Sequence, residues 1–147
     1  MQRLTHLCTL ILIGCTSAMT GPISELPFTS ATNSCGPTDG PAVSITFSSM
    51  PPQNSRVEMP YVTVTILTAV DNLAGRTFRI SAASPEGYGG FVGENDRRVG
   101  AVAGTMRVND VLRDSSIVGS ANLTLADGSR IEGAFAAPWR TTRILCG

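Results

Sequence analysis

The sequence contains no lysine, and its single histidine, His6, lies near the start of the chain. All eleven basic residues are therefore arginines. Without lysine, and with histidine only at its start, the main part of the chain has no Ser–His or Cys–His pair, no Schiff-base lysine and no phosphate-loop lysine. It also lacks the histidine ligands typical of catalytic zinc. These absences exclude several enzyme classes, and we expect neither a metal site nor a cofactor.

Charge is scarce and balanced. Charged residues make up 15% of the 147 residues, and eleven basic side chains match eleven acidic ones. A chain with no net charge has no field that would attract DNA or RNA, so we expect no nucleic acid as a partner. The hydrophobic fraction of 42% suits a chain that folds around one core, and the length suits one domain.

The N-terminal residues have the three-part pattern of a secretory signal: Arg3 without nearby acids, an apolar run from Leu7 to Ile13, and then small residues. The run is shorter than the roughly 20 residues of a transmembrane helix. Its end, Leu12-Ile13-Gly14-Cys15, resembles the lipobox of bacterial lipoproteins. The resemblance covers the first 15 residues and implies cleavage before Cys15, diacylglycerol on its thiol and acylation of its new amino group. The alternative is a plain secretory signal that is cut after Ala18.

The resemblance implies an address in the cell envelope, with the lipid bilayer as a partner through the acylated N-terminus. Thr16 follows the cysteine, and the lack of Asp there resembles the outer-membrane sorting pattern, with the protein facing the periplasm or the surface. We therefore expect a signal peptide over 1–14, a lipidated tether over 15–34 and a β domain over 35–147.

Only two of the four cysteines fall in the expected domain. Cys8 would be removed with the signal, which leaves Cys35 and Cys146 at the two ends of the domain. An exported protein folds in an oxidising compartment, so we expect these two thiols to form a disulfide. The CxxC spacing of a redox pair and the further ligands of a metal site are missing.

Between these cysteines the apolar residues alternate with polar ones, and turn residues separate the alternating runs. A three-residue turn, Ala126-Asp127-Gly128 with Gly128 left-handed, would pair Leu123 with Ile131. No window shows a helical period. The sequence predicts an all-β fold, a small antiparallel β-sandwich or barrel of six to seven strands closed by one disulfide. The expected strands lie at 42–47, 61–67, 76–82, 98–108, 117–125, 131–135 and, after a break at Pro138, 141–146.

The segment from Ser84 to Arg98 combines four glycines with aromatic and charged residues. It looks like a connection without regular structure, and connections of this length are often binding loops. The alternative is a partly β-paired connection with solvated charges. The residues that we expect to contact a partner are Tyr88, Phe91, Glu94, Asp96, Arg97 and Arg98.

The sequence favours a binding or structural module over an enzyme, with an unknown envelope protein or glycan as partner. One alternative is a small hydrolase that acts on envelope glycans through a pair of carboxylates, and another is an inhibitor of an envelope-attacking enzyme. No residue is assigned a catalytic role. Trp139 would stack on a ligand or fill the core, and a lone tryptophan near the last strand more often fills the core.

Overall fold

The computed structural model describes residues 21–53, 56–112, 115–140, 144 and 146. Nine strands and three short 3₁₀ helices occur in these residues, so the fold is all-β, as predicted. The helices are η1 (Ile23–Glu25), η2 (Val70–Asn72) and η3 (Glu94–Asp96). The strands are β1 (Gly21–Pro22), β2 (Phe28–Cys35), β3 (Pro41–Ser48), β4 (Tyr61–Ile66), β5 (Thr77–Arg79), β6 (Gly87–Val92), β7 (Arg98–Leu112), β8 (Ser116–Leu125) and β9 (Arg130–Arg140).

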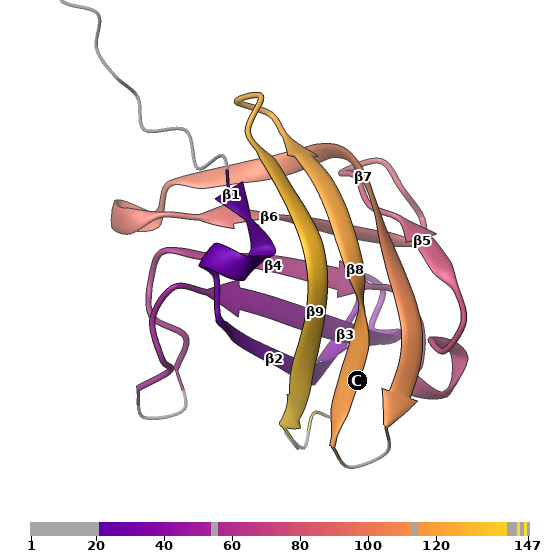
Figure 1. Ribbon diagram of the computed structural model, residues 1–147. Coiled ribbons are helices and arrows are strands. Elements are labelled where there is room, and N and C mark those ends of the chain that lie inside the picture. Colours follow the sequence, from indigo (N-terminus) through magenta and orange to yellow (C-terminus); the bar gives the residue numbers. More distant parts are fainter. Residues whose placement is uncertain (1–20, 54–55, 113–114, 141–143, 145, 147) are drawn as a thin grey trace, which may run out of the picture.

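Seven of these strands form a closed barrel in the order β2-β3-β4-β6-β7-β8-β9, and β9 pairs back with β2. Figure 1 shows β8 and β9 crossing in front of β3 and β4. The short strand β5 is an extra strand that pairs with β7, and β1 pairs with β9. On the edge away from β8, β9 pairs with β1 and β2, and both of these pairs are parallel. Every other strand pair in the sheet is antiparallel. The barrel is therefore mixed rather than purely antiparallel.

Apolar side chains that alternate along the strands fill the middle of the barrel. Three inward residues of β3 and three of β4 are completely buried: Val43, Ile45, Phe47, Val62, Val64 and Ile66. The Phe47 ring packs edge-on against the ring of Phe135 of β9, with 5.4 Å between the centroids. The two strands predicted from the clearest alternation therefore form one wall of the core.

The expected tether is wrong over the part that the structure describes. Residues 21–34 belong to the folded domain, because β1 and β2 are strands of the sheet and Ile23 and Leu26 are buried in the core. The polar sequence of β2 hid this strand. Ala31 of β2 lies beside the bulky Ile45 of β3, and both are buried on the inner face. A small residue fills the space at this position, so β2 lacks the alternation of large apolar residues that marks a strand.

The predicted hairpin between β8 and β9 is confirmed. Leu123 lies opposite Ile131, and Gly128 has a φ of 84° in the turn. The expected break at Pro138 is wrong, since β9 continues through it to Arg140 and Pro138 lies opposite Ser116. The predicted strand at 141–146 falls mainly outside the described residues, and Ile144 and Cys146 are in no strand.

The predicted disulfide is confirmed. Cys35 and Cys146 are 111 residues apart in the sequence, and their Cα atoms lie 5.6 Å apart. Cys35 ends β2, and the Cys146 Sγ lies 3.8 Å from the carbonyl oxygen of Ser34. The bond therefore fixes Cys146 against the end of β2.

The signal peptide at 1–14 and the lipidation site Cys15 lie outside the described residues, so both stay predictions. Where the chain is described, it contains no helix long and apolar enough to cross a membrane.

Candidate functional site

The segment from Ser84 to Arg98 is not a loop without structure. It contains β6, the short helix η3 and the start of β7. β6 pairs with β7 on one side and with β4 on the other. Glycine takes the place of apolar residues at Gly87, Gly89 and Gly90, so the alternation that marks a strand is missing from the sequence. The alternative reading of this segment, a partly β-paired connection, describes it better.

The two aromatic residues of this segment lie on opposite faces of β6. Tyr88 is opposite Thr65 on the outer face, where 38% of it is exposed. Phe91 is opposite Val62 and Val99, both buried, and packs against the core. Tyr88 and Phe91 therefore do not form one contact surface.

The charged residues of the segment are also divided. The Nη2 atom of Arg97 lies 3.7 Å from Oδ2 of Asp127, which links the β6–β7 turn to the β8–β9 turn. Hydrogen bonding from Ser129, and to a smaller extent the positive charge of Arg97, lowers the pKa of Asp127. Glu94 and Arg98 are exposed. The side chain of Asp96 lies outside the described part of the structure, so its expected role stays a prediction.

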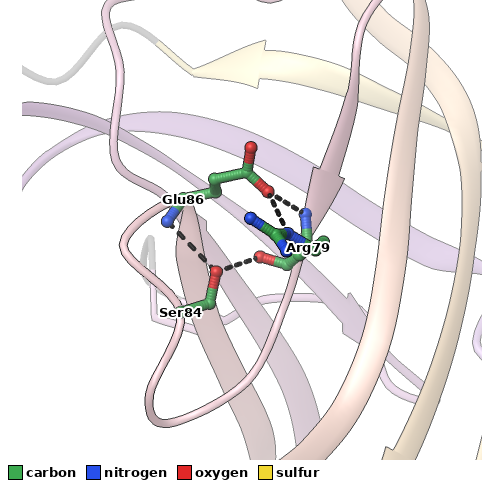
Figure 2. Close-up of polar contacts among 3 residues, drawn as sticks. All are labelled: Arg79, Ser84 and Glu86. Carbon is green, nitrogen blue, oxygen red and sulfur yellow. Dashed lines mark hydrogen bonds and ion pairs between the residues drawn. The ribbon is translucent and has the colours of Figure 1, made fainter.

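A polar network closes the connection between β5 and β6 (Figure 2). Oε2 of Glu86 accepts hydrogen bonds from the backbone amide of Arg79 at 2.8 Å and from its Nε at 3.3 Å. The Ser84 hydroxyl donates to the Arg79 carbonyl at 2.8 Å and accepts from the Glu86 amide at 3.1 Å. These bonds from the backbone and then from the side chain of Arg79 lower the pKa of Glu86. A carboxylate held in its ionised form is poorly suited to act as the general acid of a hydrolase.

A different part of the molecule has the form of a ligand site. A hollow of about 510 Å³ lies at the end of the barrel where β7 and β9 end and β8 begins, the lower end in Figure 1. We call it the end hollow. It is lined by Asn33, Val70, Asp71, Ala74, Val111, Leu112, Ser116 and Trp139.

Strand alternation explains how this lining arises. On β2, Ala31 is fully buried, and Asn33, two positions later on the same inner face, is exposed where the core ends. Val111 of β7 lies opposite the buried Ile117, which places it on the inner face as well. At this end of the barrel the inner faces of the strands thus contribute Asn33, Val111 and Trp139 to the lining. Leu112 and Ser116, which lie opposite each other, adjoin the inward residues Val111 and Ile117 and reach the hollow from the strand ends.

Trp139 connects the end hollow to the core. It lies two positions after the buried Ala137 of β9, is paired with Ala31 of β2, and its amide donates to the carbonyl of Ser115 at 2.8 Å. The side chain is half-buried and packs against the core. The indole of Trp139 therefore packs against the core and also lines the hollow, and its stacking on a ligand stays a prediction.

The other residues of the end hollow were missed from the sequence. They come from β2, the β4–β5 connection with η2, the end of β7 and the start of β8. Only Trp139 carried a signal, as the single tryptophan of the chain. Asn33 stands in a run of small polar residues that resembles a linker.

A second hollow, of about 420 Å³, lies beside the β2–β3 turn, but its described lining contains neither an aromatic nor a charged side chain. In the described parts of the chain, no three histidine, cysteine, aspartate or glutamate side chains are grouped to hold a metal ion. Comparisons with protein-family models, curated proteins and solved structures found no match.

Proposed function

We propose that this chain is a cell-envelope lipoprotein, anchored by lipid on Cys15, whose β-barrel is a binding module. The observation that supports binding is the end hollow, which opens at one end of a barrel whose middle is filled by buried apolar side chains. Ligand sites are concave, largely apolar and supplied with a few polar groups, and their volumes are about 300 to 1,000 Å³. Val70, Val111 and Trp139 supply the apolar part, and Asn33 and Ser116 supply polar groups.

The proposed address rests on the N-terminal sequence and agrees with the chemistry of the folded part. Leu12-Ile13-Gly14-Cys15 resembles a lipobox, and the Cys35–Cys146 disulfide suits an exported protein, because such bonds persist in oxidising compartments. The acylated N-terminus would hold the protein at a membrane, by our proposal the outer membrane, facing the periplasm or the surface. The partner would be a protein or a glycan of the envelope.

Replacement of Cys15 tests the anchor. In Cys15→Ser no thioether can form, so we expect the protein to leave the membrane fraction and to lose acyl labelling, because each buried methylene of the acyl chains contributes ~0.8 kcal/mol to membrane binding. Membrane fractionation and labelling with a fatty-acid analogue measure both effects.

Cys8→Ser is the matched control, since it also removes a thiol of the N-terminal segment but leaves the lipobox intact. This variant should be labelled and should fractionate like the parent. Retention of Cys15→Ser in the membrane fraction, with acyl label unchanged, would show that the anchor is elsewhere.

A further inference from the structure

We propose that the barrel rests on the lipid bilayer with the end opposite the end hollow, so that the hollow opens toward the aqueous phase. This inference rests on the proposed lipid anchor at Cys15 and adds the orientation of the folded part. The contact is made by three exposed apolar residues, Phe28, Met50 and Met59, which we call the apolar patch.

The apolar patch gathers around Ser48 at the end of β3. Phe28, the first residue of β2, lies opposite Ser48. The Ser48 hydroxyl accepts a hydrogen bond from the Met50 amide at 3.1 Å. It also donates one, at 3.4 Å, to the carbonyl oxygen of Glu58, which precedes Met59. The three residues are therefore held close to one point of the surface, and each is 39 to 40% exposed.

The start of the described chain lies at the same end of the barrel. Gly21 of β1 pairs with Ile131, which follows the β8–β9 turn. The ion pair of Arg97 with Asp127 links this turn to the β6–β7 turn. The end of β6 lies opposite the start of β4, next to the β3–β4 connection that carries two residues of the apolar patch. Figure 1 shows the β3–β4 connection and the β6–β7 turn together at the left of the barrel.

The proposed anchor is close enough to bring this end of the barrel to the membrane. Cys15 precedes Gly21 by six positions. A segment of this length spans at most about 20 Å, since an extended chain advances by about 3.3 to 3.6 Å per residue. Acyl chains inserted at Cys15 would therefore hold Gly21, and with it the end that carries the apolar patch, beside the lipid headgroups.

The chemistry of the apolar patch suits the boundary between headgroups and acyl chains. Exposed apolar groups that lie together mark contact surfaces, and a phenyl ring with two flexible thioethers can enter this boundary without a fixed complementary shape. The exposed charges described at this end are of both signs, as Glu25, Arg56 and Arg98 show. The contact is therefore apolar in kind and differs from the basic surfaces that bind anionic lipids.

The end hollow lies at the other end of the same strands. β2 begins with Phe28 and reaches Asn33 of the hollow five positions later, an advance of about 16 Å along the strand. β7 begins with Arg98 at the β6–β7 turn and ends with Leu112 of the hollow. When the apolar patch is on the bilayer, the hollow therefore opens away from it, where an envelope protein or glycan can enter.

Hydroxyl-radical footprinting tests the orientation, because Met50 and Met59 are themselves reactive reporters. The acylated protein is bound to vesicles of phosphatidylethanolamine and phosphatidylglycerol, and the Cys15→Ser variant free in buffer is the reference. We expect the oxidation of both methionines to fall at least about threefold on the vesicles, because residues at the headgroup and acyl boundary are shielded from water. Leu112 at the hollow end, which is 47% exposed, should be oxidised equally in both samples.

A carboxylate placed in the apolar patch tests the contact itself. Met50→Glu should return the oxidation of Met59 on vesicles to the reference rate, because a charge is costly to remove from water. Tyr88→Glu is the matched control, since Tyr88 is 38% exposed and Met50 39%, but Tyr88 lies on the outer face of β6. Met59 should stay protected in this control, and circular dichroism checks that both variants fold.

The inference is overturned if the parent floats with the vesicles while both methionines are oxidised at the reference rate. Protection of Leu112 in place of the methionines, or equal effects of Met50→Glu and Tyr88→Glu on Met59, would also overturn it. A parent that carries no acyl label and does not float contradicts the anchor as well, so the failures of the two proposals are distinguishable.

Discussion

At the scale of single residues, Glu86 shows how the partners of a side chain decide its role. In the sequence it is one of several carboxylates near a glycine-rich segment, which left a hydrolytic role open. In the structure it accepts two hydrogen bonds from Arg79, and Ser84 bonds to the backbone of both residues. Arg79 is seven positions away at the end of another strand, so this pairing depends on how β5 and β6 are connected. The sequence shows the carboxylate but does not show its donors.

The network predicts a pH dependence of stability. The bonds from Arg79 lower the pKa of Glu86 below its ordinary value of 4.5, so the folded state binds this proton less readily than the unfolded state does. The stabilisation is therefore fully present above pH 4.5 and is lost as the pH falls toward the lowered value. We expect Glu86→Gln to melt at a lower temperature than the parent at pH 7, and the difference to shrink below pH 4.5.

Glu94→Gln is the control for this measurement, because it removes an exposed carboxylate from the neighbouring turn. Thermal melts of the three proteins between pH 7 and pH 3 make the comparison. A Glu86→Gln variant as stable as the parent at pH 7, or a difference that grows as the solution is acidified, contradicts the assigned role.

At the scale of elements, the clarity of the apolar alternation decided which strands were predictable. β3 and β4 each carry three inward apolar residues separated by Ser or Thr, and both were predicted nearly to their ends. β6 has glycine at inward positions, and β2 has alanine and polar residues, so neither shows the pattern. Their backbones form the same hydrogen-bonded ladders, but only side chains leave a pattern in a sequence.

The glycines of β7 give an element-scale prediction. A Cβ atom at Gly104 would lie 2.5 Å from the carbonyl oxygen of Asn122 and 2.9 Å from the Cα of Leu123, both on β8, whereas one at Gly100 would meet nothing within 4 Å. We therefore expect Gly104→Ala to lower the free energy of unfolding by about 1 to 3 kcal/mol, because β7 and β8 would have to move apart.

Gly100→Ala is the matched control in the same strand and should change the free energy of unfolding by no more than about 0.5 kcal/mol. Urea unfolding followed by circular dichroism measures both. Equal stability of the two variants would mean that β7 and β8 do not approach as closely as described.

At the scale of the whole molecule, the closure of the barrel joins segments that are far apart in the sequence. β2 pairs with β9 through Ala31 with Trp139 and Thr32 with Arg140, and this parallel contact turns a sheet into a barrel. The strand pattern could not choose between sandwich and barrel, because that choice depends on which edges meet. The disulfide was predictable from compartment and cysteine count, whereas the end hollow was not, since its residues come from five separate segments.

The disulfide should be a large contributor to the stability of the barrel. It closes a loop of 111 residues, and a bond of this kind typically contributes about 2 to 4 kcal/mol, mainly by restricting the unfolded chain. We expect the double variant Cys35→Ser, Cys146→Ser to melt about 10 °C lower than the parent and to keep its β-type circular dichroism spectrum at low temperature.

Reduction of the parent should lower its melting temperature by a similar amount, while the double variant should not respond to the reductant. A parent protein whose melting temperature is unchanged by reduction would contradict a stabilising bond between Cys35 and Cys146.

If the barrel binds its partner at the end hollow, as we propose, NMR chemical-shift mapping should locate the bound ligand there. The isotope-labelled full-length protein is titrated with a tetrasaccharide of N-acetylglucosamine as the glycan probe, and the backbone amides, the Trp139 indole N–H and the Asn33 side-chain amide are followed. We predict that the largest shifts occur at Asn33, Val111, Ser116 and Trp139, which line the hollow, while Tyr88 and Arg98 on the outer face of the barrel do not shift. Shifts confined to residues 84–98, or no shifts at saturating sugar, would contradict the claim.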